Sequence, residues 1–151
     1  MSVAFRRESD DEHLEPTFEL PLPSGPNLVT PRGRALIDER IGALEHQIAA
    51  TEDAEVVKKL RRDLRYWQTR QVTAVETAPR SDGAVGFGNR VTFTLGGKER
   101  RVTLVGDDEA DPAAGTIPFS APLARALMGA EAGEIVAFNG REDAIEVMAV
   151  V

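Results

Sequence analysis

The sequence of 151 residues contains no cysteine, which excludes disulfide bonds and thiolate metal sites. Its two histidines, His13 and His46, lie in separate segments and argue against a zinc site. Aromatic residues make up only 5% of the chain, although hydrophobic residues at 42% are enough for a core. No apolar run approaches the roughly 20 residues of a membrane span, and the acidic N-terminal region lacks the apolar segment of a signal peptide. We therefore expect a cytoplasmic protein that does not bind membranes.

Positive charge is also in short supply. Lysine and arginine number 18 against 25 aspartates and glutamates, so the formal net charge is −7. A chain of this sign is not attracted as a whole to nucleic acid or to anionic lipid. We expect any contact with nucleic acid to be local, or to be arranged by a partner.

Residues 28–77 are predicted to form an antiparallel helical hairpin. Thr30 is a favourable N-cap residue, and Pro31 suits the first helical position. The apolar residues of the two helices alternate between spacings of three and four, which is typical of a coiled coil. They are Ile37, Ile41, Leu44 and Ile48 on the first helix, and Val57, Leu60, Leu64 and Trp67 on the second. The second helix is expected to begin near Thr51 or Glu52 and to end near Val75.

The tip of this hairpin is acidic, and the helix that follows it is basic. Glu52, Asp53 and Glu55 have two interpretations: ligands for a metal, or charges that stabilise the start of the helix by roughly 0.3–1 kcal/mol each. The basic residues are either a solvated surface or contacts to RNA phosphates and a protein partner. The candidates for such contacts are Lys58, Lys59, Arg61 and Arg62.

The remaining segments differ in composition. Residues 1–27 are acidic and then rich in proline, so we predict a disordered or loosely docked tail. Residues 78–84 have the composition of a linker. Residues 85–151 are predicted to form a small domain of antiparallel strands with one short helix, which makes the fold class α+β.

Two turns and one helix are the clearest signals in that small domain. Gly96-Gly97 and Asn139-Gly140 each separate segments of alternating apolar residues, as in β-hairpins. The strands after these turns are expected at 101–105 and 144–150. The short helix is predicted from Pro122 to Met128, with Gly129 closing it.

Four stretches of this domain resemble the C-terminal domain of the GreA/GreB family of bacterial transcription elongation factors. They are Phe87–Thr92, Val105–Asp111, Gly115–Ile117 and Ala121–Gly129. The resemblance covers Leu28 to Val150, and the hairpin supports it by architecture. It implies a C-terminal domain with an FKBP-like fold that docks at the rim of the secondary channel of RNA polymerase, and a hairpin that enters the channel. The docking residues that it implies are Asp107, Asp108, Glu109, Asp111, Ser120, Pro122 and Arg125.

The resemblance also implies a chemistry for the hairpin tip. In members that stimulate RNA cleavage, tip carboxylates help to hold a second Mg²⁺ in the polymerase, which then hydrolyses the 3′ end of backtracked RNA. Glu52 and Glu55 match the family's pair of acids three residues apart, without the glycine, asparagine and tyrosine that usually surround that pair. The chain would then be a monomer with no cofactor of its own. It would not be an enzyme, and would share the Mg²⁺ of RNA polymerase beside the nascent RNA.

Three hypotheses about function remain open at this point. The first is a factor that stimulates cleavage. The second is a non-catalytic regulator that competes with cleavage factors, because the predicted arm, about 30 Å long at 1.5 Å per residue, is shorter than theirs. The third is a separate interaction module or prolyl isomerase, which the absence of Tyr and Trp from the small domain disfavours. A calcium site in the acidic loop 107–111 is also disfavoured, because the loop lacks EF-hand spacing.

Overall fold

The computed structural model describes residues 19–151. The chain divides into two compact units. Unit 1 consists of Ile37–Thr73 together with the described residues up to Gly25, and unit 2 consists of Pro26–Leu36 and Ala74–Val151. Most of the tail predicted over residues 1–27 lies outside the described residues.

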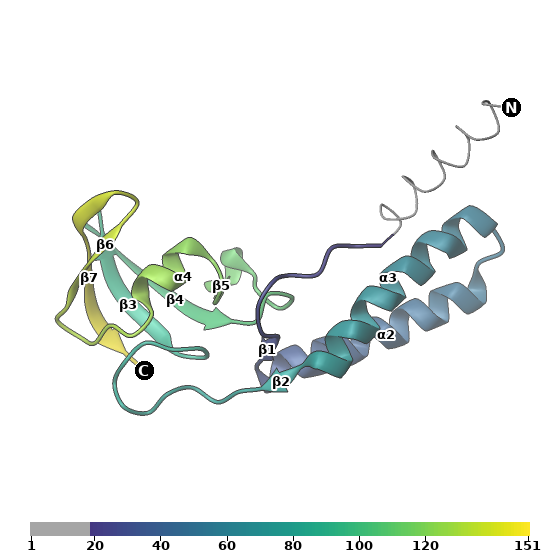
Figure 1. Cartoon of the computed structure of the whole chain (residues 1–151), viewed down its shortest axis with the longest axis horizontal. Coiled ribbons are helices and arrows are strands. Elements are labelled where there is room, and N and C mark those ends of the chain that lie inside the picture. The colour runs from purple at the N-terminus through teal and green to yellow at the C-terminus, as the bar shows by residue number, and fades with distance from the viewer. Residues whose placement is uncertain (1–18) are drawn as a thin grey trace, which may run out of the picture. The chain divides into compact units, whose positions relative to one another are not determined.

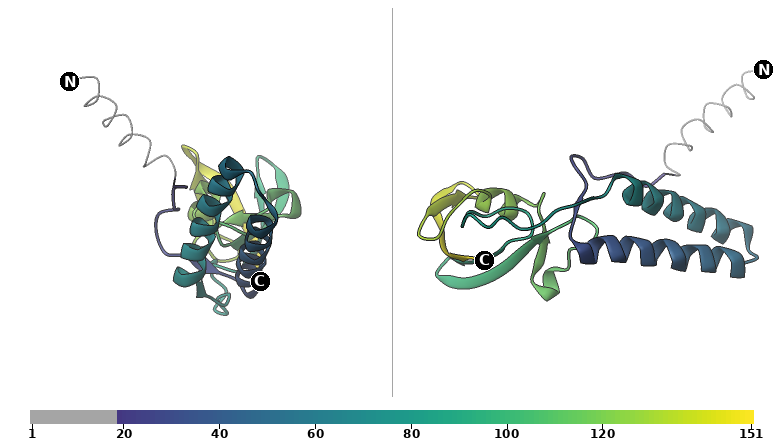
Figure 2. Two further views of the ribbon diagram at one scale, coloured as in Figure 1. Left: turned by 90° about the vertical axis from the view of Figure 1, so that its right-hand side faces the viewer. Right: turned by 90° about the horizontal axis from the view of Figure 1, so that it is seen from below.

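Two helices of equal length form the hairpin. Helices α2 (Pro31–Ala50) and α3 (Ala54–Thr73) have 20 residues each and run alongside one another (Figures 1 and 2). Gln71 Nε2 donates a hydrogen bond of 2.9 Å to Asp38 Oδ1, and the Arg40 guanidinium lies 5.6 Å from the ring centroid of Trp67. Residues from early in α2 therefore meet residues from late in α3, as an antiparallel pair requires.

The apolar seam lies where the spacing predicted it. Ile37 and Ile41 are buried, and the other six seam residues are partly buried while most of their neighbours are exposed. The seam is narrow and includes a polar margin, since Arg40 covers the face of Trp67 and Tyr66 packs edge-on against that ring. Cation–π contact of this kind adds to the burial of a large ring.

The end of the second helix differs from the prediction. Helix α3 ends at Thr73, and Val75–Glu76 form a strand, β2, that pairs in parallel with β1 (Leu28–Val29). The Val75 N–H donates to the Asn27 carbonyl at 2.9 Å, and the Thr77 N–H donates to the Val29 carbonyl at 2.9 Å. Strands of two residues are too short to show any period in the sequence, so the sequence pattern predicts helix up to Val75.

The sheet of unit 2 has five strands in the order β5-β4-β3-β7-β6. All neighbouring strands are antiparallel except β4 and β5, which are parallel. The α+β class is confirmed, and the sheet is mixed where an antiparallel one was expected. The bounds are β3 (Arg90–Leu95), β4 (Lys98–Val105), β5 (Thr116–Pro118), β6 (Ile135–Phe138) and β7 (Arg141–Val150), with a short 3₁₀ helix, η1 (Pro112–Ala114), before β5.

Both predicted hairpin turns are confirmed. Gly96 and Gly97 have φ values of +61° and +80°, and Asn139 and Gly140 have +55° and +85°. Positive φ at both central residues is the requirement of a type I′ turn, which glycine and asparagine meet at little cost. Strands β4 and β7 begin directly after these turns, three residues earlier than predicted.

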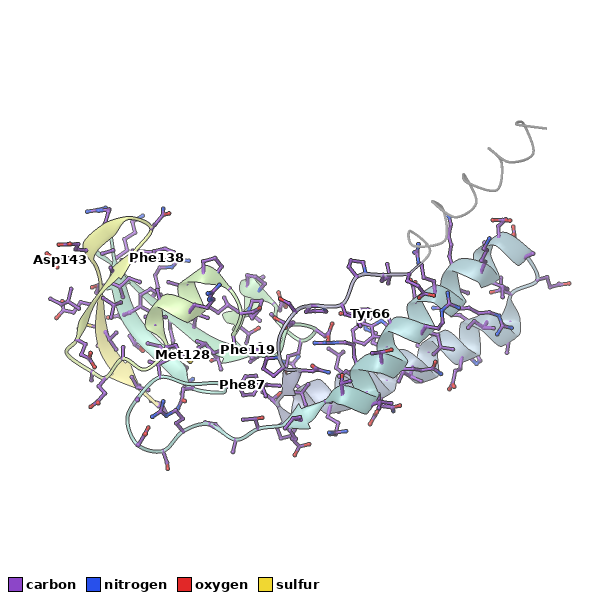
Figure 3. The ribbon with its side chains drawn as sticks, viewed as in Figure 1. Tyr66, Phe87, Phe119, Met128, Phe138 and Asp143 are labelled. Atoms are coloured by element: carbon purple, nitrogen blue, oxygen red, sulfur yellow. The ribbon has the colours of Figure 1, made fainter. Side chains whose placement is uncertain are left out.

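The core of unit 2 lies between the sheet and helix α4 (Pro122–Leu127), which the sequence also predicted (Figure 1). Phe93, Leu104 and Ile145 of the sheet are fully buried, as is Leu127 of α4. Phe87 and Phe119 pack edge to face with ring centroids 5.4 Å apart, beside this core (Figure 3). This packing gives Phe87, Phe93 and Phe119 a structural role.

Asn89, in the first of the four family-like stretches, is a buried polar residue that is fully paired. Its Oδ1 accepts from the N–H groups of Gly86 (3.0 Å) and Arg80 (3.2 Å). Its Nδ2 donates to the carbonyls of Arg80 and Val151, at 3.0 Å each. One side chain thus ties the linker and the C-terminus to the start of β3, and its role is structural.

We predict that Asn89→Ala lowers the free energy of unfolding of unit 2 by about 2–4 kcal/mol, because it leaves several backbone groups without partners. Urea unfolding followed by NMR resonances of β3 and β4 measures this change. The control is Ser81→Ala, an exposed substitution nearby that should stay within about 0.5 kcal/mol. Equal stabilities for the two variants would contradict this role for Asn89.

Candidate functional site

The tip of the hairpin is a connection of three residues, Thr51 to Asp53, between α2 and α3. Thr51 closes α2, because its hydroxyl donates to the Gln47 carbonyl at 2.6 Å and its N–H donates to the Ile48 carbonyl at 3.4 Å. The connection is therefore short and ordered by its own hydrogen bonds. Glu52, Asp53 and Glu55 are all exposed on it or beside it.

Asp53 acts as the N-cap residue of α3. Its Oδ1 accepts from the N–H groups of Glu55 (2.9 Å) and Val56 (3.4 Å), and its carbonyl accepts from the Val57 N–H at 3.0 Å. Side chains that accept from these first N–H groups are what makes aspartate a favoured cap. Helix α3 consequently begins at Ala54, slightly later than the sequence predicted. One carboxylate oxygen of Asp53 is committed to the helix.

The tip does not contain a complete metal site by itself. Within residues 19–151, no group of three or more His, Cys, Asp or Glu side chains is arranged to hold a metal ion. Glu52 precedes the cap and Glu55 lies in the first helical turn, so both carboxylates remain directed to solvent. The arrangement can offer oxygen ligands to a metal that a partner also binds.

Helix α3 carries a basic face, which we define as Lys58, Lys59, Arg62 and Arg65. With Glu55 these side chains line an open depression of about 320 Å³. Arg62 Nη2 lies 3.5 Å from Asp63 Oδ1, and Arg65 Nε donates to Glu19 Oε1 at 2.7 Å. The remaining candidate contact, Arg61, is exposed and does not line the depression. Three of the four basic residues that the sequence predicted as contacts therefore line this depression, together with Arg65.

In unit 2, Glu109 of the acidic loop is turned inward. Its carboxylate accepts hydrogen bonds from the Thr30 N–H (3.0 Å), the Thr30 hydroxyl and the Gly106 N–H (3.1 Å). The Thr30 hydroxyl in turn caps α2 by accepting from the Gly33 N–H at 3.0 Å. We call this arrangement the Glu109 clamp. Its carboxylate serves the folding of unit 2, whatever other contacts the loop makes.

The clamp explains a glycine near the start of α2. A Cβ atom on Gly33 would lie 2.3 Å from Glu109 Oε2, whereas one on Gly42 of the same helix would meet nothing within 4 Å. Sequence reasoning missed the clamp, because Thr30 and Glu109 are 79 residues apart. The local signal was Gly33 itself, since a glycine in the first turn of a helix can mark a place where another group comes close to the backbone.

The other candidate docking residues gather around the loop and the start of α4. The Ser120 hydroxyl donates to Asp107 Oδ1, which brings two of them together. Asp111 caps η1 by accepting from the Ala113 N–H at 3.2 Å. Asp111, Ser120, Pro122 and Arg125 are exposed, and Asp107 and Asp108 are partly buried. The exposed residues include one acid, Asp111, and one base, Arg125.

Within residues 19–151, the linker contains the one pair of side chains with clearly shifted pKa values. Arg80 Nε and Nη2 donate to the two carboxylate oxygens of Asp82, at 3.1 and 2.5 Å. This hydrogen bonding, aided by the Ala84 N–H, lowers the pKa of Asp82 and raises that of Arg80. The pair is exposed and lies outside the tip and the candidate docking residues.

These features define a class: a protein with an antiparallel helical hairpin, acidic at its tip, and an α+β domain. The model of the family described as "Transcription elongation factor, GreA/GreB, C-term" matches residues 80–150. Residues 80–150 therefore match the C-terminal domain of the GreA/GreB family. Among the described residues, no helix has the length and apolarity needed to cross a bilayer.

The curated relatives are transcription elongation factors GreA. The chain is 34% identical over 103 residues to the protein from Caulobacter vibrioides, a match of 67% of this chain and 57% of that protein. It is 36% identical over 93 residues to the protein from Vibrio parahaemolyticus, covering 60% and 59% of the two chains. The chain thus spans a little over half the length of these relatives.

Two solved structures are also similar in outline. One is the GreA factor homolog 1 (Gfh1) of Thermus thermophilus, with a TM-score of 0.39 and 14% identity over 84% of this chain and 99% of that one. The other is a GreA/GreB elongation factor from Nitrosomonas europaea, with a TM-score of 0.39 and 18% identity over 85% and 99%.

The clamp predicts opposite effects for two glycines of α2. Gly42→Ala should stabilise the protein by up to about 1 kcal/mol, because alanine favours the helix and nothing obstructs its Cβ. Gly33→Ala should destabilise it by about 1–3 kcal/mol, because the Glu109 carboxylate must move and lose its hydrogen bonds. Thermal unfolding of the two variants measures the difference.

A double variant identifies the cause of that loss. On a Glu109→Ala background the clamp is already absent, so adding Gly33→Ala should cost nothing further. Such non-additivity is the mark of residues that share one interaction. Equal and additive costs in both backgrounds would show that Gly33 is needed for another reason.

Proposed function

We propose that this chain binds bacterial RNA polymerase at its secondary channel and modulates transcription elongation. The observation that carries the proposal is the family match over residues 80–150, next in sequence to a hairpin with exposed acids at its tip. GreA, the name borne by the curated relatives, is an elongation factor, which supports polymerase as the partner.

Docking on the polymerase is assigned to the exposed residues of unit 2 around the start of α4. Asp111, Ser120, Pro122 and Arg125 present both signs of charge within a short span of chain. Charges on this surface that meet opposite charges on the polymerase would steer association and fix its orientation. Glu109 takes part only indirectly, because its carboxylate is engaged with Thr30 and Gly106.

The tip acts, in this proposal, beside the catalytic Mg²⁺ of the polymerase. Glu52 and Glu55 supply carboxylate oxygens, the ligands that a hard cation prefers. A second Mg²⁺ held jointly by the tip and the polymerase would stabilise the oxygens that attack and leave the scissile phosphate of backtracked RNA. The basic face of α3 provides contacts to RNA or to polymerase near that site.

A second candidate is a non-catalytic occupant of the same channel that competes with cleavage factors. Two observations favour it. Helices of 20 residues give an arm of only about 30 Å. Capping of α3 also commits a carboxylate oxygen of Asp53, which leaves fewer tip oxygens for a metal. Both candidates share the binding site and differ in the outcome at the RNA 3′ end.

Addition of the protein to a stalled, backtracked elongation complex separates the two candidates. Assistance by the tip is supported if the natural chain stimulates RNA cleavage and Glu52→Ala/Glu55→Ala lowers the cleavage rate at least tenfold with binding unchanged. Asp53→Asn keeps the helix cap while removing the charge, and so reports on charge alone. Glu45→Ala, which removes an exposed acid from the middle of α2, is the control and should have no effect.

Other outcomes decide the remaining possibilities. The competitor is established if the chain binds without causing cleavage and also slows the cleavage that an added GreA protein stimulates. Failure to bind polymerase at all contradicts the proposal in both forms.

A further inference from the structure

The basic face of α3 lies beside the point where the described chain begins. Glu19 is the first described residue, and its carboxylate accepts from Arg65 Nε at 2.7 Å. Arg65 forms one end of the basic face, with Arg62, Lys59 and Lys58 following toward the hairpin tip. The described chain therefore begins in contact with one end of the basic face.

The segment that precedes Glu19 has the charge opposite to that of the face. Residues 8–15 contain five acids and no lysine or arginine. Helix α3 contains six basic residues and only two acidic ones. The five acids of the segment are Glu8, Asp10, Asp11, Glu12 and Glu15.

The distances allow these charges to meet. Lys58 precedes Arg65 by seven residues, which is about 10 Å along a helix at 1.5 Å per residue. Glu15 precedes Glu19 by four residues, which span at most about 14 Å of chain. Starting from the Glu19–Arg65 contact, the chain that precedes Glu19 is thus long enough for the acidic segment to reach every member of the basic face.

From these observations we propose that the basic face is the docking surface for the acidic segment 8–15 of the same chain, which covers it until a polyanion displaces the segment. Exposed ion pairs are individually weak and are screened by salt, so this cover is reversible. Tethering raises the local concentration of the segment to the millimolar range, which compensates for weak pairs. The segment would thereby regulate access of RNA or polymerase to α3.

Docking itself can be tested without polymerase, so the result does not depend on the proposed function. Because the chain has no cysteine, Ser9→Cys carries a single spin label on the full chain. At low salt the label should broaden the amide resonances of Lys58, Lys59 and Arg62. The broadening should disappear at about 1 M salt, where the screening length falls to about 3 Å.

A variant of the tail supplies the matched control. It keeps the label and the length of the chain, and replaces the five acids by Glu8→Gln, Asp10→Asn, Asp11→Asn, Glu12→Gln and Glu15→Gln. Broadening of α3 should be lost in this variant. Persistence of the broadening would show that charge does not cause the contact, and would overturn the proposal.

Two further outcomes also count against the proposal. One is broadening centred on the other basic stretch, Lys98 to Arg101 of β4, in place of α3. The second is found by measuring the affinity of the natural chain and of the neutralised variant for a short single-stranded RNA. The neutralised variant should bind this RNA about three- to tenfold more tightly than the natural chain at low salt, because the face is uncovered. Equal affinities would show that the segment does not compete.

Discussion

The hydrogen bonds accepted by the Glu109 carboxylate are the interaction on which the fold of unit 2 depends. It accepts hydrogen bonds from the backbone and side chain of Thr30, at the start of α2, and from the backbone of Gly106, after β4. Two glycines make room for it. A Cβ on Gly33 would strike the carboxylate, and one on Gly106 would lie 2.6 Å from the Leu28 carbonyl. A side chain at Gly33 would displace the carboxylate from its hydrogen bonds, and one at Gly106 would force that backbone away from Leu28.

The parallel pair β1–β2 reinforces the same region. It joins the residues just before α2 to those just after α3, through hydrogen bonds that involve Asn27, Val29, Val75 and Thr77. Arg34 adds a bond of 3.1 Å to the Ala74 carbonyl and an ion pair of 3.4 Å with Glu76. Both ends of the hairpin segment are therefore tied within unit 2 by backbone as well as side-chain contacts. Backbone pairing of this kind tolerates changes of sequence that the seam of the hairpin would not.

What the sequence could predict was governed by local signals. The seam from Ile37 to Trp67, the two type I′ turns and α4 all follow from spacing or from turn residues within a few positions. The β1–β2 pair, the parallel contact of β5 and the Glu109 clamp could not be predicted, because each joins segments distant in sequence. Asp53 lies between these cases. From its charge, the sequence predicts either a metal ligand or a residue that stabilises the helix dipole. The structure adds a hydrogen-bonded helix cap, which the spacing alone does not identify.

The same distinction applies to the proposed site. Residue types located the acids at the tip and the basic residues on α3, since both are contiguous in the sequence. Only the structure separates Arg61 from the face formed by Lys58, Lys59, Arg62 and Arg65. The tip and the basic face thus belong to one short helical arm, and the family match over residues 80–150 supports RNA polymerase as its proposed partner.

The most direct test of this account is to ask what the hairpin tip touches. Ala50→Cys, on a chain with no other cysteine, places a benzophenone crosslinker at the end of α2 and leaves all three tip acids in place. In an elongation complex, we predict crosslinks to polymerase residues that line the secondary channel, suppressed by an excess of a GreA protein. Crosslinks confined to the outer surface of polymerase, or none in a complex that binds the chain, would contradict it.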